Sequence, residues 1–123
     1  MANIIATSNA PAAIGPYVQG RIAGGFVFLS GQLGMNADGT LPEAFEAQAH
    51  NCFKNLRAIL EEGGSSLAKV VKATVFLSDL ENFAACNAIY AEYFTEPFPA
   101  RSCFEVGRLP KDALVEIEVI AER

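Results

Sequence analysis

At 123 residues the chain has the length of one domain, and since no linker-like stretch divides it we expect a single domain over residues 1–123. The formal net charge of -5 argues against a nucleic-acid partner, because nucleic-acid affinity depends on clustered Lys and Arg and only 9 such residues are scattered along this chain. The chain has neither a basic leader segment nor an apolar run of about 18 residues, so we expect a cytoplasmic protein without a membrane span.

The first half of the sequence predicts two strands followed by a long helix. Residues 3–6 and 26–30 are rich in β-forming side chains, the first segment weakly. After a turn at 36–39, apolar residues recur at the spacing of one helix face, and a Gly-Gly pair at 63–64 ends the helix. This face consists of Phe45, Ala49, Cys52, Phe53, Leu56, Ile59 and Leu60. The chain's one histidine, His50, falls off the apolar face, so we expect it to be solvated.

The second half predicts a strand, a helix and two further strands. Residues 70–77 are β-rich, and Asp79 is a suitable N-cap for a second helix, which Pro97 and Pro99 terminate. One stripe of this helix consists of Phe83, Asn87, Tyr90 and Phe94. The two final β-rich segments are 101–106 and 114–121.

The resulting order, β-β-α-β-α-β-β, indicates an α+β fold. In the last strand, apolar side chains alternate with the carboxylates of Glu116 and Glu118, so one sheet face is apolar. The apolar positions are Val115, Ile117, Val119 and Ala121. We expect both helices to cover this face, which leaves the opposite face to meet either water or another subunit.

The segment from Pro99 to Pro110, P-A-R-S-C-F-E-V-G-R-L-P, and the V-E-I-E run at 115–118 resemble the signature of the RidA family, also called the YjgF/YER057c/UK114 family. The resemblance extends to 9–20, 29–32, 75–80 and 83–90, and so covers nearly the whole chain. It implies a chorismate-mutase-like α+β fold, with two helices on one face of a mixed sheet of about six strands. It also implies a homotrimer in which the other sheet face is turned inward.

The resemblance further implies hydrolysis of reactive 2-imino acids and their enamine tautomers to 2-oxo acids and ammonia. The expected substrates are 2-iminobutanoate and 2-iminopropanoate, which pyridoxal-phosphate-dependent dehydratases release. No cofactor and no metal are expected, and the three cysteines have the spacing of neither a zinc site nor a disulfide framework. The connection at 95–99 looks a few residues shorter than in the longer archetypes, which leaves the preferred substrate size open.

Two other functions stay open at this point. One is a non-catalytic homotrimer that binds small carboxylates and acts as a sensor or as a partner of another enzyme. The other is RNA cleavage, an activity attributed to some relatives, which the acidic composition does not favour.

Arg101 and Glu116 are the expected catalytic residues. A planar guanidinium can hold a substrate carboxylate through two parallel hydrogen bonds, although the pattern alone favours an ordinary surface arginine at Arg101. Glu116 and Glu118 are indistinguishable by pattern, and only the resemblance selects Glu116 as the carboxylate that orients and deprotonates the attacking water. A simple hairpin of the last two strands would hold Arg101 and Glu116 roughly 13 Å apart, so we doubt that these strands form one.

The expected substrate-binding residues, besides Arg101 and Glu116, are Tyr17, Ser30, Gly31, Asn87, Ser102 and Cys103. We expect Tyr17, Ser30 and Gly31 to come from a neighbouring subunit. Tyr17 follows a Gly-Pro turn that projects its ring into a cleft or into an interface, two alternatives that the residues alone leave open. Gly31 permits close approach of the backbone to a ligand, the alternative being an ordinary strand end.

Asn87 is expected to hold the cleft through side-chain hydrogen bonds, or else to be a satisfied polar residue in the core. Backbone groups near Cys103 are expected to position the water together with Glu116. We expect no nucleophilic role for the Cys103 thiol, because the sequence predicts no neighbouring base that could deprotonate it.

Overall fold

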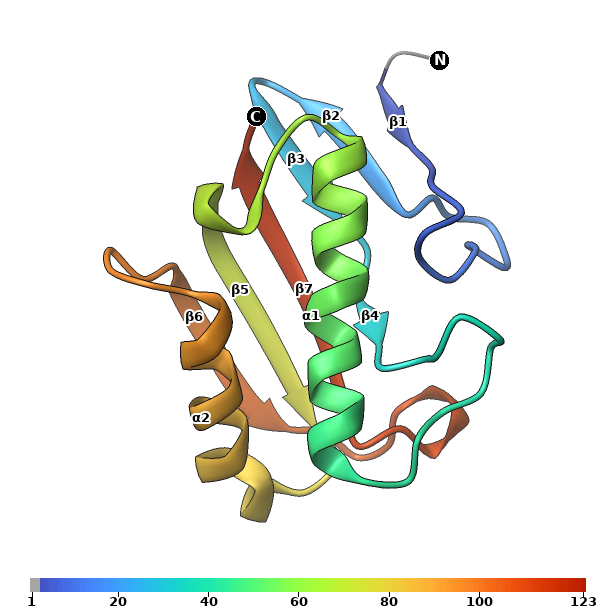
Figure 1. Cartoon of the computed structure of the whole chain (residues 1–123), viewed down its shortest axis with the longest axis vertical. Coiled ribbons are helices and arrows are strands. Elements are labelled where there is room, and N and C mark those ends of the chain that lie inside the picture. Colours follow the sequence, from blue (N-terminus) through green and yellow to red (C-terminus); the bar gives the residue numbers. More distant parts are fainter. Residues whose placement is uncertain (1–2) are drawn as a thin grey trace.

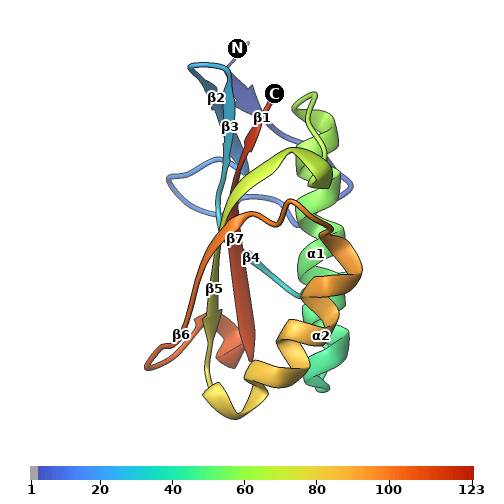
Figure 2. The same ribbon diagram turned by 90° about the vertical axis from the view of Figure 1, so that its left-hand side faces the viewer.

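A mixed β-sheet that carries both α-helices on one face forms the described part of the protein, residues 3–123 of a computed structural model (Figure 1). Figure 2 shows the sheet edge-on, with both helices on the same side. The helices are α1 (Phe45–Glu62) and α2 (Phe83–Tyr93), with short 3-10 helices at Leu67–Lys69, Leu80–Asn82 and Pro110–Asp112. The strands are β1 (Ile4–Ile5), β2 (Gly20–Ala23), β3 (Phe26–Leu29), β4 (Gln32–Leu33), β5 (Val70–Leu77), β6 (Ala100–Glu105) and β7 (Val115–Glu122).

The strand order is β1-β2-β3-β7-β5-β6, and β4 pairs with a further part of β7. Strands β5 and β6 are parallel, joined through α2, whereas the other neighbouring pairs are antiparallel. The predicted α+β fold with two helices on one face is confirmed. Because β5 lies between β6 and β7, the last two strands form no hairpin, in agreement with the doubt raised by the sequence.

The sheet has seven strands, more than the sequence predicted, because the pattern missed β2 and β4. Strand β2 has four residues and starts with glycine, and β4 has two residues, so neither shows an alternation long enough to detect. Strands β2 and β3 form a hairpin whose turn is Gly24-Gly25, with φ values of 59° and 81°. A Gly-Gly pair between apolar segments is a hairpin signal that could have revealed β2.

The core lies between the helices and the sheet. Every residue of the predicted apolar face of α1 is buried. Strand β7 contributes its four predicted apolar residues to the same core, so Glu116 and Glu118 are left on the other face. Among the described residues, no helix is both long and apolar enough to cross a membrane.

The predicted stripe of α2 is only partly a core stripe. The buried residues of this helix are Cys86, Ile89 and Tyr90, whereas Phe83 is 39% exposed. The helix starts at Phe83 because a 3-10 turn precedes it, and Asp79 caps that turn with its side chain. Tyr90 and Phe94 of the stripe therefore belong to the core, whereas Phe83 and Asn87 lie outside it.

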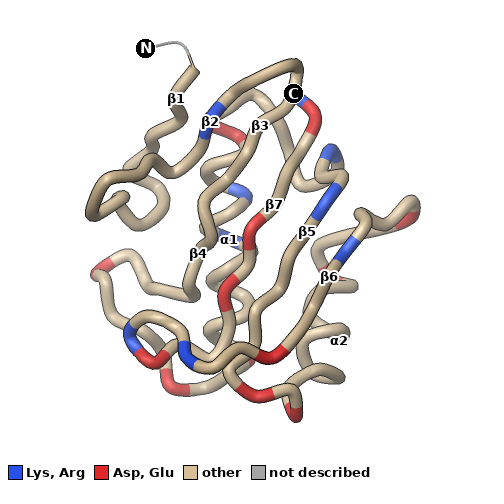
Figure 3. Tube along the Cα trace, turned by 180° about the vertical axis from the view of Figure 1, so that it is seen from behind, with Lys and Arg blue, Asp and Glu red and all other residues tan. Residues whose placement is uncertain are grey.

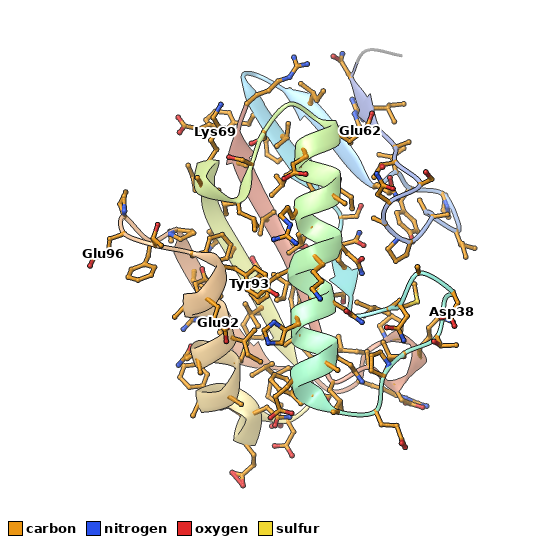
Figure 4. The ribbon with its side chains drawn as sticks, in the orientation of Figure 1. Asp38, Glu62, Lys69, Glu92, Tyr93 and Glu96 are labelled. Atoms are coloured by element: carbon orange, nitrogen blue, oxygen red, sulfur yellow. The ribbon has the colours of Figure 1, made fainter. Side chains whose placement is uncertain are left out.

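His50 is half-buried, so the expectation of a solvated side chain is wrong. Its Nδ1 lies 2.7 Å from the Tyr93 hydroxyl, and the Tyr93 ring stacks on Phe53 with 4.5 Å between ring centroids. Figure 4 shows Tyr93 in the space between α2 and α1. The periodicity of α1 gives its core face, but it cannot show that a second helix covers its flank.

Candidate functional site

The sheet face opposite the helices carries two separate pairs of aromatic rings, Phe26 with Phe28 on β3 and Phe76 with Phe104 on β5 and β6, which together we call the aromatic patch. Three of these rings are 38% to 45% exposed, and Phe76 and Phe104 contact edge to face with centroids 5.4 Å apart. Figure 3 views this face and shows acidic positions along β7 and basic positions on β5 and β6. Neighbouring exposed aromatic rings on a small domain mark an interaction site. This open face is therefore a candidate for contact with another chain.

Arg101 lies on β6, and its side chain points to the helix side of the sheet. Its Nη1 donates a hydrogen bond to Asn87 Oδ1 on α2, at 2.8 Å. Within residues 3–123 the one ion pair joins Arg108 to Asp112, so no described carboxylate neutralises the half-buried Arg101. A half-buried guanidinium without a counter-ion favours an anionic ligand such as a carboxylate. We call Arg101 and Asn87 the Arg101 half-site.

Glu116 lies on β7, points to the open face and is half-buried. A Cβ atom on Gly31 would lie 2.6 Å from Glu116 Oε2, so the close approach that Gly31 permits is to this carboxylate. Burial, and to a smaller extent the charge of Glu118, raises the pKa of Glu116 above the ordinary value of 4.5. A carboxylate with a raised pKa is a better proton acceptor, which suits general base catalysis.

Glu116, Gly31 and Tyr17 line one cavity of about 380 Å³. Tyr17 is 52% exposed, and its hydroxyl accepts a long hydrogen bond of 3.4 Å from the Ile14 backbone N–H. The turn before it needs glycine, because Gly15 has a φ of 127°. The remaining lining residues are 11–14, Gln19, Gln32, Leu33, Met35, Pro110 and Lys111. We call Glu116, Gly31 and Tyr17 the Glu116 half-site.

The two serines among the expected binding residues occupy different places. Ser30 Oγ donates a hydrogen bond of 2.6 Å to the carbonyl oxygen of Val18, which fixes the loop that carries Tyr17. Ser102 is exposed on the open face, where Lys72 Nζ donates to its Oγ at 3.3 Å. Ser30 thus supports the Glu116 half-site, whereas Ser102 lies outside both half-sites.

Cys103 is half-buried on the helix side of β6, two residues after Arg101. Burial raises the pKa of its thiol, and the nearby Arg101 charge opposes this to a smaller extent. A thiol with a raised pKa is a poor nucleophile at neutral pH, which supports the expected positional role. All three cysteines are free, and within residues 3–123 no group of three or more His, Cys, Asp or Glu side chains is placed to hold a metal ion.

A single chain does not bring Arg101 and Glu116 together. Arg101 pairs with Ala73, which is buried under the helices, whereas Glu116 pairs with Phe76 on the open face. Because side chains alternate between the faces of a sheet, the two expected catalytic residues lie on opposite faces. The sequence-based grouping placed Glu116 beside Arg101 and took Tyr17 from a neighbour. The structure differs in the place of Glu116, which lines the same cavity as Tyr17 and Gly31 of its own chain.

The fold and the two half-sites define a class, that of small α+β proteins with a candidate site for a small anionic molecule. The family described as Endoribonuclease L-PSP has a sequence model that matches residues 7–123. The chain therefore belongs to this family, which is the RidA family, and the resemblance noted in the sequence is confirmed.

Relatives match the chain over its full length. The 2-iminobutanoate/2-iminopropanoate deaminase of Escherichia coli strain K12 is 51% identical, and the alignment covers 100% of this chain and 99% of the relative. The crystal structure of RidA from the Antarctic bacterium Psychrobacter has a TM-score of 0.93 at 45% identity, covering 97% of this chain and 98% of the other. The crystal structure of E. coli TdcF with bound serine has a TM-score of 0.92 at 44% identity, covering 98% of each chain.

Proposed function

We propose that this chain hydrolyses 2-imino acids, as a 2-iminobutanoate/2-iminopropanoate deaminase. The observation that carries the proposal is the Arg101 half-site, a half-buried cation that no described carboxylate neutralises. A 2-imino acid places its reactive C2 atom directly beside a carboxylate, so a fixed guanidinium would bind the substrate and set the orientation of C2. Identity of 51% with a deaminase over the full length supports the same reaction.

In the proposed reaction Arg101 binds the substrate carboxylate while Glu116 acts on water. The water oxygen adds to C2 as Glu116 accepts its proton, and the electron pair of the C=N double bond moves to nitrogen, which takes up a proton. The nitrogen receives the proton that Glu116 took from water, which restores the Glu116 carboxylate. In the tetrahedral intermediate the hydroxyl proton then passes to the amine, the C–N bond breaks with release of ammonia, and the carbonyl group forms. One imino acid and one water give one 2-oxo acid and one ammonia.

We propose further that each complete site forms between two copies of the chain in a homotrimer. Since Arg101 and Glu116 lie on opposite faces, both can reach one substrate only where the open face of one copy meets the β6 edge of another. Strand β6 is the last in the sheet order, so Arg101 lies at an edge that a neighbour can approach. The aromatic patch supplies apolar surface for this contact.

Mixing two inactive variants is expected to restore activity. Arg101→Ala chains keep the Glu116 half-site, and Glu116→Gln chains keep the Arg101 half-site. When equal amounts are unfolded, mixed and refolded, about one quarter of the sites receive two intact halves, so about one quarter of wild-type activity should return. The control refolds each variant alone. Activity that does not exceed the sum of the two controls would contradict a site shared between chains.

Replacing Gly31 with Ala is expected to lower kcat about tenfold while the protein stays folded. The added methyl group overlaps the Glu116 carboxylate, so that side chain must move away from its place. Steady-state kinetics and a thermal melt check the two parts of this prediction. Gly107→Ala is the matched control, because a Cβ there meets no atom within 4 Å. Equal kcat values for the two variants would show that the position of Glu116 has no effect on the reaction.

A competition assay tests the proposed function. An amino-acid oxidase releases the 2-imino acid, semicarbazide traps it, and hydrolysis by the protein lowers the initial rate of semicarbazone formation. A wild-type protein without effect would exclude the deaminase, and binding of 2-oxobutanoate by that protein would then support the non-catalytic carboxylate binder. The family description names an endoribonuclease, but the net charge of -5 gives no electrostatic support for RNA binding.

A further inference from the structure

The Arg101 guanidinium lies over two aromatic rings of α2. Its Cζ is 4.8 Å from the centroid of the Tyr90 ring and 5.7 Å from the centroid of the Phe83 ring. Both distances fall within the range of about 6 Å in which the face of a ring attracts a cation. We call Phe83 and Tyr90 the aromatic clamp.

Helix geometry brings the aromatic clamp and Asn87 to one side of α2. Phe83, Asn87 and Tyr90 follow the spacing i, i+4 and i+7, which is a single helix stripe. Tyr90 is 6% exposed and packs edge to face against Phe53 of α1, with 5.9 Å between ring centroids. The core thus holds the Tyr90 ring in place, and the ring can in turn support Arg101.

All of these contacts to Arg101 come from neutral groups. A carboxylate partner would hold the guanidinium, but it would also neutralise the charge and compete with a substrate carboxylate for the same N–H groups. Asn87 accepts a hydrogen bond from one guanidinium nitrogen. The faces of the two rings attract the positive charge without accepting hydrogen bonds from the other N–H groups of the guanidinium, which lie in its plane. Two parallel hydrogen bonds to a ligand therefore remain possible.

We propose that Phe83 and Tyr90 are positioning residues, which fix the Arg101 guanidinium in the orientation that binds the substrate carboxylate. The inference rests on the proposed deaminase function and extends it to two residues outside the set expected from the sequence. Without the rings, Arg101 samples other rotamers, and carboxylate binding weakens while the Glu116 half-site is untouched. The signature is a raised KM with a nearly unchanged kcat.

The Tyr90 hydroxyl provides a matched control. It is buried and has no hydrogen-bond partner among the described residues, so the ring rather than the hydroxyl is what Arg101 uses. Tyr90→Phe keeps the ring and removes a polar group that is costly to bury, so this variant should be at least as stable as the wild type. Tyr90→Leu removes the aromatic face and keeps an apolar side chain.

The experiment measures KM and kcat for imine hydrolysis in three variants. We expect KM to rise about tenfold in Tyr90→Leu and about threefold in Phe83→Leu, and to stay within about twofold of the wild type in Tyr90→Phe. If Tyr90→Leu does not fold, the KM of Phe83→Leu tests the aromatic clamp, because Phe83 is 39% exposed and its truncation opens no core cavity. Nitrogen-15 NMR of the Arg101 side chain, which reports rotation about the Nε–Cζ bond, is the second readout.

Two results would overturn the aromatic clamp. One is an unchanged KM in the folded Leu variants, and the other is a KM in Tyr90→Phe as high as in Tyr90→Leu. Failure of the deaminase function is a separate outcome, in which the wild type hydrolyses no imine. In that case 2-oxobutanoate is the probe: weaker binding and faster Arg101 rotation in Tyr90→Leu than in Tyr90→Phe still support the clamp, and equal values reject it.

Discussion

Replacing Arg101 with Lys is expected to lower kcat/KM for imine hydrolysis about 100-fold, although the positive charge is kept. An ammonium group cannot donate two parallel hydrogen bonds to a carboxylate. It also cannot keep the hydrogen bond to Asn87 and the contact with the Tyr90 ring while it reaches a ligand. The semicarbazide competition assay over a range of imine concentrations measures kcat/KM for the wild type and the variant.

Arg108→Lys is the matched control for this prediction. The Arg108 side chain is 79% exposed and pairs with Asp112 on the surface, so its replacement should leave kcat/KM unchanged. Both variants keep the net charge, so a difference between them reflects geometry at Arg101 alone. An Arg101→Lys protein as active as the control would mean that a point charge suffices and that the geometry of the guanidinium is not used.

Replacing Glu116 with Gln is expected to lower kcat by a factor of about 100 to 10,000 with little change in KM, because an amide cannot accept the proton of the attacking water. The substitution keeps the size of the side chain and leaves the Arg101 half-site intact. Glu118→Gln is the control, since Glu118 lies on the same strand and the same face but is exposed. Equal losses in the two variants would count against Glu116 as the specific base.

The Glu116→Gln protein is also expected to be at least as stable as the wild type at neutral pH. The folded protein raises the pKa of Glu116, so folding disfavours the ionised form. This cost is fully present above the folded-state pKa and disappears as the pH falls below the ordinary value of 4.5. Urea unfolding at several pH values should show the advantage of the variant shrinking towards acid pH. A wild type that is more stable than the variant at pH 7 would argue against this burial cost.

The sequence was sufficient to predict the elements that bury one face along their whole length. The apolar face of α1 and the alternation of β7 were both predicted residue by residue. In each element the pattern of buried apolar residues recurs over several helical turns or several alternating residue pairs, which is long enough to detect. Strand β4 could not be predicted, since its two residues become a strand only through pairing with β7. The flank of α1 at His50 was misjudged for the same reason, because α2 covers it only in the folded chain.

The residues of the candidate site came from the family resemblance, and their arrangement came from the structure. Pattern alone could not separate Glu116 from Glu118, whereas the structure distinguishes them by burial and by the nearby Gly31. The assignment of Arg101 and Glu116 to opposite faces depends on β5 lying between β6 and β7, which is a matter of strand order and register. One hint in the sequence was Asn87, a polar residue within an aromatic stripe, which fits a stripe that lies only partly in the core.

The separation of Arg101 and Glu116 on two sides of one sheet also bears on how activity responds to concentration. In the proposed assembly a lone chain carries parts of two different sites and no complete one. Dilution below the dissociation constant of the assembly would therefore abolish turnover without unfolding any chain. A substitution that weakens only the contact between chains would then behave in kinetic assays as a loss of enzyme, and adding more protein would reverse it.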